Sequence, residues 1–184
     1  MPKLLTIGLV IGVLVILILY VISTYNKLIY QREYIYNAMG NISAAIESRW
    51  DALTNLISAT NKYSEHEASV LKDVTAQRTG VSKNSTPAEI VRDEELFNKA
   101  LSRINVVAEN YPQLKADQVY IKTMDSVNSY EDVVRKSRMI YNDTVTKFNR
   151  MVQVFPASLV ASIFGFRKED YFKNTESKAE MPSW

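Results

Sequence analysis

The residues of this sequence that could do chemistry are charged side chains set on otherwise apolar helical stripes. Glu131 and Arg138 lie seven residues apart on one stripe, and Arg49 holds the same kind of position on another. A charge buried among apolar side chains needs a partner, because desolvating it alone is costly. We therefore expect Glu131 to pair with Arg49 or another facing arginine, and the three residues to fix the register of packed helices. A proton-binding site is the functional alternative.

Other catalytic and metal-binding groups are scarce. The chain has no cysteine, and His66 is its only histidine. A metal site would need further ligands at ligand spacing, and Glu67 alone does not supply them. The sequence has no glycine-rich phosphate loop, and a serine–histidine triad would have to use His66. The sequence thus predicts a protein that is not an enzyme and has no cofactor and no metal site. A hydrolase built on His66 is the alternative.

The charges are mixed in sign, and the formal net charge is +2. A nucleic-acid-binding protein would need a basic stripe or patch. We therefore expect no nucleic-acid partner.

Residues 4–22 form an apolar run with neither a charge nor a proline. A helix of about 20 such residues spans the hydrocarbon core of a bilayer. A cleaved signal peptide is the alternative, since Val21 and Ser23 form a weak cleavage pair, but signal peptides have shorter apolar regions. Gly8 and Gly12 have the spacing that lets two membrane helices approach closely. The run therefore predicts a transmembrane helix that can associate with a second copy.

The side of the membrane that holds the remainder follows from the flanking charges. Lys3 precedes the apolar run, whereas Lys27 and Arg32 follow it. The positive-inside rule then favours a cytoplasmic location for the bulk domain.

The remainder is predicted to be helical, because glycine and proline number only five each and punctuate the chain rarely. Apolar residues recur at alternating spacings of three and four, as on the buried side of a packed helix. Thr86, Pro87 and Glu89 signal a helix start with a capping box. We expect helices over about 25–79, 87–111, 117–155 and 157–165, then a polar tail over 173–184.

Residues 51–54 decide whether the first of these helices is one piece. Asp51 and Asn55 share a helix face and could cap a kink or join a core network, and a break there would give four helices of matched length. The apolar stripe keeps its phase across this point, which favours a continuous helix. A continuous helix would leave part of the Leu28–Ile46 stripe without a partner in the same chain, so we expect a homo-oligomer.

The apolar segment after Pro156 is too short to span a bilayer. A short helix that caps the core is the favoured interpretation. The alternative is an interfacial segment, in which Phe164 and Phe166, followed by Arg167 and Lys168, contact lipid headgroups.

Short motifs occur along nearly the whole chain after the apolar run. They are Tyr25-Asn26, Arg49-Trp50-Asp51, Asn55-Leu56-Ile57, Tyr63, His66-Glu67, Leu101-Ser102, Ala108-Glu109-Asn110-Tyr111-Pro112-Gln113-Leu114-Lys115-Ala116, Arg138, Tyr141-Asn142, Phe148-Asn149, Phe155-Pro156, Ala161, Phe164-Gly165-Phe166 and Tyr171-Phe172. Together they resemble the LemA family of bacterial membrane proteins. The resemblance implies an N-terminal anchor, an all-helical body and no established enzymatic activity. Thr54 departs from it, since the family usually has proline there.

These observations predict an all-α protein. A transmembrane helix would continue into an antiparallel up-and-down bundle of three to four long helices over residues 25–172. We expect a membrane-anchored, non-enzymatic structural or scaffold protein, with lipid and further copies of itself as partners. The alternative is an accessory or regulatory subunit that binds another protein, either a membrane-associated enzyme or a signalling system.

Overall fold

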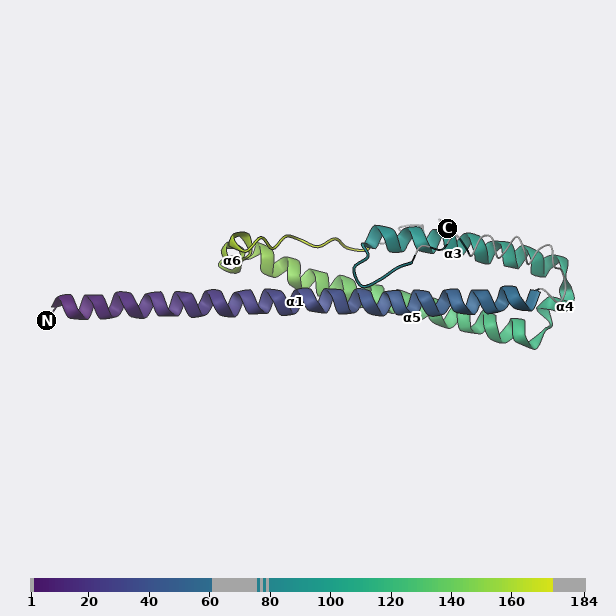
Figure 1. Cartoon of the computed structure of the whole chain (residues 1–184), viewed down its shortest axis with the longest axis horizontal. Coiled ribbons are helices and arrows are strands. Elements are labelled where there is room, and N and C mark those ends of the chain that lie inside the picture. The colour runs from purple at the N-terminus through teal and green to yellow at the C-terminus, as the bar shows by residue number, and fades with distance from the viewer. Residues whose placement is uncertain (1, 61–75, 77, 79, 174–184) are drawn as a thin grey trace, which may run out of the picture. The chain divides into compact units, whose positions relative to one another are not determined.

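The computed structural model describes residues 2–60, 76, 78 and 80–173, and all regular secondary structure in these residues is helical. The elements are α1 (Pro2–Thr60), α3 (Pro87–Asn110), α4 (Pro112–Lys115), α5 (Gln118–Gln153) and α6 (Ala157–Ile163) (Figure 1). A long, apolar N-terminal helix is followed by helices that pack against it. The predicted all-α fold class is confirmed.

Helix boundaries follow the local signals in the sequence. Thr86 Oγ1 accepts a hydrogen bond from the Glu89 N–H, and Glu89 accepts one from the Thr86 N–H, so the capping box is formed. The Thr86 N–H and the Thr86 hydroxyl both donate to the Glu89 carboxylate, and these two bonds lower the pKa of Glu89. Asp117 accepts a bond from the Val119 N–H at 2.7 Å at the start of α5. The short α4 between α3 and α5 is an element that the sequence analysis missed.

Helix α1 has no break at residues 51–55. Thr54 retains its backbone N–H, which the family's proline would lack, and its hydroxyl donates to the Trp50 carbonyl at 2.9 Å. Asp51, Thr54 and Asn55 therefore do not interrupt the helix. The predicted helix end at residue 79 is too late, because Ala76 and Arg78 are not helical, and residues 61–75 lie outside the described part of the chain.

The described residues divide into two compact units. Met1–Tyr36 and Asp143–Glu169 form the first unit, and Asn37–Asn142 with Asp170–Trp184 form the second. Helices α1 and α5 each contribute residues to both units.

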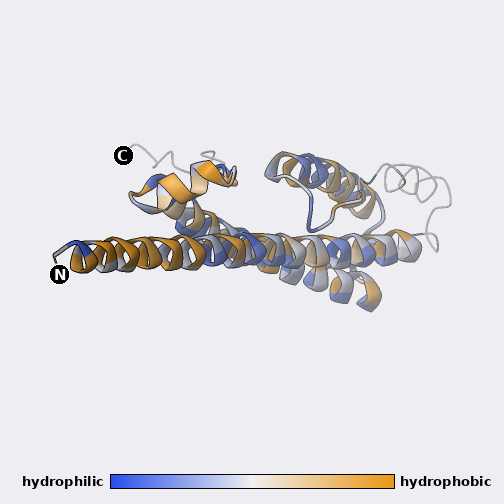
Figure 2. Cartoon of the chain, turned by 60° about the vertical axis from the view of Figure 1, so that its left-hand side comes forward, coloured by the Kyte–Doolittle hydropathy of each residue, from blue (hydrophilic) through white to orange (hydrophobic). Residues whose placement is uncertain are grey.

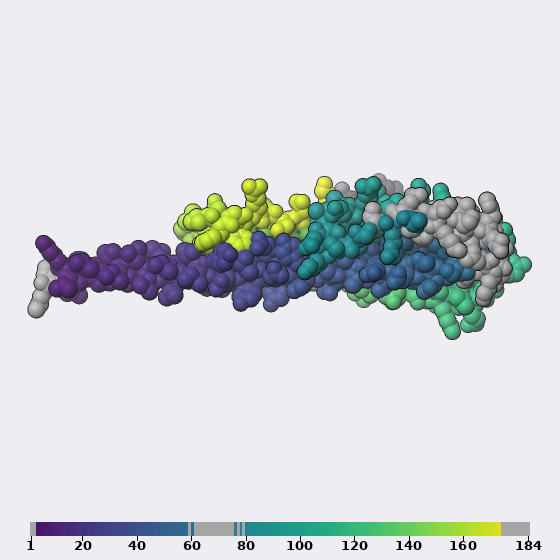
Figure 3. All heavy atoms as spheres, viewed as in Figure 1, coloured from purple at the N-terminus to yellow at the C-terminus, as the bar shows by residue number. Residues whose placement is uncertain are grey.

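In the first unit, α6 and the segment after it pack on α1 and on the end of α5 (Figure 3). Gly165 has a φ of +73°, a conformation that costs glycine little, and the chain reverses there. The Phe166 N–H donates to the Ala161 carbonyl and the Gly165 N–H to the Ser162 carbonyl, which is the Schellman pattern. This turn carries the Phe166 ring back into the core.

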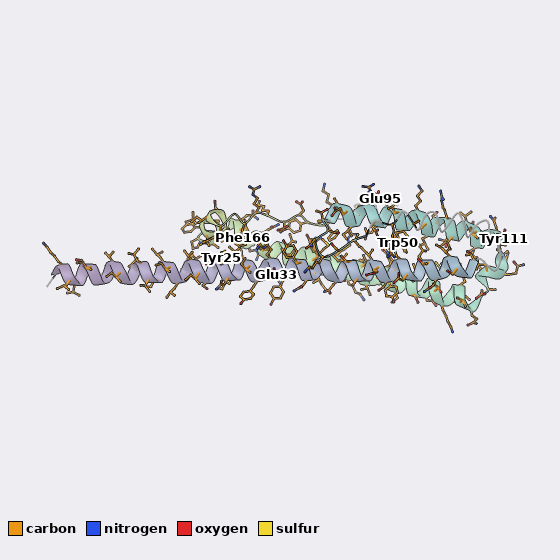
Figure 4. The ribbon with its side chains drawn as sticks, viewed as in Figure 1. Tyr25, Glu33, Trp50, Glu95, Tyr111 and Phe166 are labelled. Atoms are coloured by element: carbon orange, nitrogen blue, oxygen red, sulfur yellow. The ribbon has the colours of Figure 1, made fainter. Side chains whose placement is uncertain are left out.

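Phe166 is therefore buried, so it does not take the place at the headgroups that the interfacial alternative gave it. Its ring centroid lies 5.8 Å from that of Tyr25 and 6.3 Å from that of Phe148 (Figure 4). The Arg32 guanidinium lies over the same ring at 5.2 Å. Asn149 of α5 then holds the next part of the segment through both backbone groups of Glu169, at 2.8 and 2.9 Å.

The apolar run at the start of α1 is exposed on all sides. Figure 2 shows its hydrophobic character by the orange colour of the ribbon. Within the described chain, α1 is the helix long and apolar enough to cross a membrane. A Cβ atom added at Gly8 or Gly12 would meet open space. The first unit thus presents a helical surface suited to lipid.

The second unit contains the end of α1, all of α3 and α4, and the first part of α5. Its core is apolar and aromatic, and its largest buried side chains include Trp50, Phe97, Ile42, Leu53 and Ile90.

The stripe that was expected to need a second copy is covered by the chain itself. Leu28 and Ile35 are buried in the first unit, and Met39, Ile42 and Ile46 in the second. The prediction of an exposed Leu28–Ile46 seam is therefore wrong, and with it the argument that this seam requires an oligomer.

Candidate functional site

The most unusual residue of the second unit is Arg49 on α1, whose side chain is only 1% exposed. Its guanidinium stacks on the Phe97 ring of α3 at 4.1 Å and forms an ion pair with Glu131 of α5. Nε and Nη2 are buried and make no hydrogen bond within the described structure. The Glu131 side chain is 57% exposed, so the pair is buried on the arginine side only.

A second polar contact joins α1 to α3. The Trp50 Nε1–H donates to the Asp93 carboxylate at 2.8 Å, and Asp93 is fully buried. The Trp50 and Phe97 rings meet edge to face, with centroids 5.2 Å apart. Figure 4 marks Trp50 where α1 passes α3. Phe97 thus contacts both Trp50 and Arg49, which are neighbours in sequence.

A third contact joins α5 to α3. Arg138 Nη1 donates to both carboxylate oxygens of Glu94, at 2.7 and 2.9 Å. The Arg138 guanidinium lies over the Phe172 ring at 4.7 Å, and both backbone groups of Phe172 are bonded to Asn142. Burial raises the pKa of Glu94, while the charges of Arg138 and Arg49 act in the opposite direction.

Beside this third contact is a groove with a volume of about 920 Å³. Glu94 and Arg138 contribute to its wall, together with apolar side chains such as Val91 and Phe172. Its lining holds no cysteine or histidine. In the described part of the chain, no group of three or more histidine, aspartate or glutamate side chains is placed to hold a metal ion.

The arrangement can position helices. We name Arg49–Glu131, Trp50–Asp93 and Arg138–Glu94 the three polar links. Each joins a different pair among α1, α3 and α5, and each uses a group that would be costly to bury unpaired.

The structure brings some of the predicted site residues together and separates others. Arg49 contacts Glu131 as expected, but Arg138 pairs with Glu94, which the sequence analysis missed. Glu94 lies four residues after Ile90 and three before Phe97, so its position on the apolar stripe was a usable signal. Its neighbour Asp93 falls on the same stripe.

The other residues that were predicted to form sites lie at the surface or outside the part of the chain that the structure describes. Asp51 and Asn55 are exposed, so they do not form a core network, and Asp51 lies 3.6 Å from Arg78. Arg167 and Lys168 are exposed in the first unit. His66 lies outside the described residues.

The profile of the LemA family matches residues 38–183 of the chain. The chain belongs to the LemA family. The matched region contains all three polar links and excludes the apolar run at residues 4–22.

Curated relatives include a LemA protein and magnetosome proteins. The chain is 27% identical to protein LemA of Metamycoplasma hominis over 140 residues, 74% of this chain and 63% of that protein. It is 31% identical to magnetosome protein MamQ 2 of Paramagnetospirillum magneticum over 77 residues, 42% of this chain and 28% of that protein. MamQ of Magnetospirillum gryphiswaldense is 29% identical over 76 residues, 41% of this chain and 28% of that protein. The matches thus cover less than two thirds of each relative.

Replacing Trp50 with phenylalanine tests the link to Asp93. The W50F variant keeps an aromatic ring but removes the indole N–H, which leaves a fully buried carboxylate with one bond fewer. We expect the free energy of unfolding, measured with denaturant in detergent, to fall by about 1–3 kcal/mol. The exposed Tyr34 on the same helix is the control, and Y34F should change stability by less than about 0.5 kcal/mol. Equal effects of the two substitutions would contradict a structural role for the indole contact.

Replacing Glu94 with glutamine tests its environment. A raised pKa means that the native state binds the Glu94 proton more tightly than the unfolded chain does. This contribution to stability is present at low pH and is lost as pH rises from the usual value of 4.5 through the raised value. The stability of the wild type relative to E94Q should therefore fall across that window in denaturant titrations. E95Q, at an exposed neighbour, should track the wild type, and parallel curves for E94Q and wild type would refute the assignment.

Proposed function

We propose that this protein is a membrane-anchored structural protein without enzymatic activity. One observation carries the proposal: α1 is a single helix that begins with an exposed apolar run and also supplies Arg49 and Trp50. The charged groups of the polar links are engaged with one another, as expected where charges fix the register of packed helices. Family membership is consistent with this interpretation.

We further propose that the anchor associates with copies of itself. Gly8 and Gly12 lie one turn apart on the same side of α1, and the space beside them is open. In lipid, helices associate through such small residues because their backbones can approach closely. With the Leu28–Ile46 stripe covered, self-association is assigned to the membrane helix and no longer to that stripe.

Substitution of both glycines tests self-association. The full-length chain in mild detergent is expected to sediment as an oligomer, and G8I/G12I as a monomer, because the isoleucine side chains prevent close approach. Val10 lies on the opposite side of the helix, so V10I should leave the mass unchanged. A wild-type chain that sediments as a monomer would exclude the scaffold function.

The second candidate function is that of an accessory or regulatory subunit. The groove beside Glu94 and Arg138 favours it, because a mixed apolar and polar lining is typical of sites that accept a protein segment or small ligand. A wild-type monomer that sediments with a second protein in fixed ratio, and loses it on V91D substitution, would support this function over the scaffold.

We propose that the helical body is cytoplasmic. Of the seven lysine and arginine residues in the first unit, Lys3 alone precedes the apolar run. Because the chain has no cysteine, a single K136C substitution provides a unique label on the exposed side of α5. A membrane-impermeant maleimide should label K136C only after the cells are permeabilised. Labelling in intact cells would place the body outside.

A further inference from the structure

The outer side of α6 carries large apolar side chains that nothing in the described structure covers. Leu159 and Ile163 are spaced by four residues, so they lie along one face of α6, and they are 57% and 76% exposed. Phe155, in the turn that precedes α6, is 73% exposed. The opposite face of α6 is used inside the first unit, where Val160 and Ala161 are buried. No charged residue occurs within α6 itself, so only an apolar environment would match its outer face.

The position of α6 in the first unit indicates which environment that is. The Phe164 ring at its end contacts the Tyr25 ring, with centroids 4.8 Å apart. Tyr25 is three residues past Ile22, the end of the apolar run, which is about 4.5 Å along the helix axis. If the run fills the hydrocarbon core of about 30 Å, Tyr25 and Phe164 lie at the level of the headgroups. Figure 2 shows the same hydrophobic colouring on α6 and on the apolar run.

The charges of the first unit fit the same surface. It contains seven lysine and arginine residues against three aspartate and glutamate residues, whereas the whole chain has a formal net charge of +2. Exposed cations flank α6 on both sides: Arg150 precedes it, and Arg167 and Lys168 follow it. Cations beside an apolar face are typical of segments that lie in the interface of an anionic bilayer.

We propose that α6 is a second membrane contact. Its outer face, formed by Leu159 and Ile163, inserts at the boundary of headgroups and acyl chains in the bilayer that the start of α1 crosses, together with the exposed Phe155 that precedes α6. Arg150, Arg167 and Lys168 contact lipid phosphates. This inference rests on the proposed anchoring by residues 4–22, and it differs from the sequence-based alternative because Phe166 faces the protein core.

Fluorescence quenching in liposomes of phosphatidylcholine and phosphatidylglycerol tests the inference on the full-length chain. Single cysteines at Ile163, Val13 and Val106 each receive a small environment-sensitive dye. The lipids carry a nitroxide quencher either near the headgroup end or near the methyl end of the acyl chain. I163C should lose fluorescence mainly to the shallow quencher and V13C mainly to the deep one. V106C, exposed on α3 in the second unit, should lose little to either.

The three labels separate the possible failures. If V13C is quenched but I163C is not, α6 stays outside the bilayer and the inference is wrong, while the anchor stands. If V13C is not quenched by either lipid, the anchor itself fails, and the inference fails with it. If the I163C emission instead depends on the protein-to-lipid ratio without quenching, a second copy covers α6, which also overturns the inference.

The charged part of the proposal has its own variant. R167Q/K168Q leaves the apolar face and Arg150 unchanged, so the shallow quenching of I163C should weaken in anionic liposomes and become less sensitive to added salt. An unchanged salt response would show that these two cations do not contact the headgroups.

Discussion

The guanidinium of Arg49 is held almost wholly out of water, against the Phe97 ring and beside the Glu131 carboxylate. Leaving such a charge without its partners costs several kcal/mol. The helices that carry those partners must therefore reach their places together, or the arginine stays in solvent and the core around it does not close. The apolar side chains provide most of the driving force for folding, but they can pack in more than one helix register. The buried charge of Arg49 is compatible with few of these registers.

The two remaining polar links extend the same constraint around the second unit. Because the three links join three different pairs of helices, sliding any one helix along its axis breaks two of them. Phe97 couples them further, since it contacts both Arg49 and Trp50. Polar groups arranged in this way restrict the chain to one packing and leave few of them free for chemistry.

The sequence was sufficient to predict the features that depend on residues close together in the chain. The all-α class, the capping box at Thr86 and the uninterrupted α1 at Thr54 all follow from local preferences, and the structure contains each. The pairing of Arg138 was not predictable in the same way, because the stripe pattern gives each helix its buried side but not its neighbour. The apolar spacing suggested that Arg49, Glu131 and Arg138 form one group, whereas the packing brings Glu94 to Arg138.

Two further differences between the sequence-based expectations and the structure have a common physical origin. The Leu28–Ile46 stripe was expected to be exposed because only the other helices were considered as partners for a continuous first helix. The irregular segment after α6 was not considered as a partner. That segment returns along the first unit because Gly165 adopts a left-handed conformation, which a hydrophobicity pattern does not reveal. The same turn decides which phenylalanine faces inward, so the sequence could not separate Phe166 from the exposed Phe164.

Insertions and deletions are usually tolerated best in irregular segments, such as the one after α6. Here both of its ends within the first unit are held. Phe166 is fixed by its buried ring and its bond to Ala161, and Glu169 by both groups of the Asn149 amide. Only residues 167 and 168 lie between them, and they belong to no helix. A length change of one residue at this point would remove either the ring from the core or the backbone from the amide, so this stretch should tolerate changes of length as poorly as a helix does.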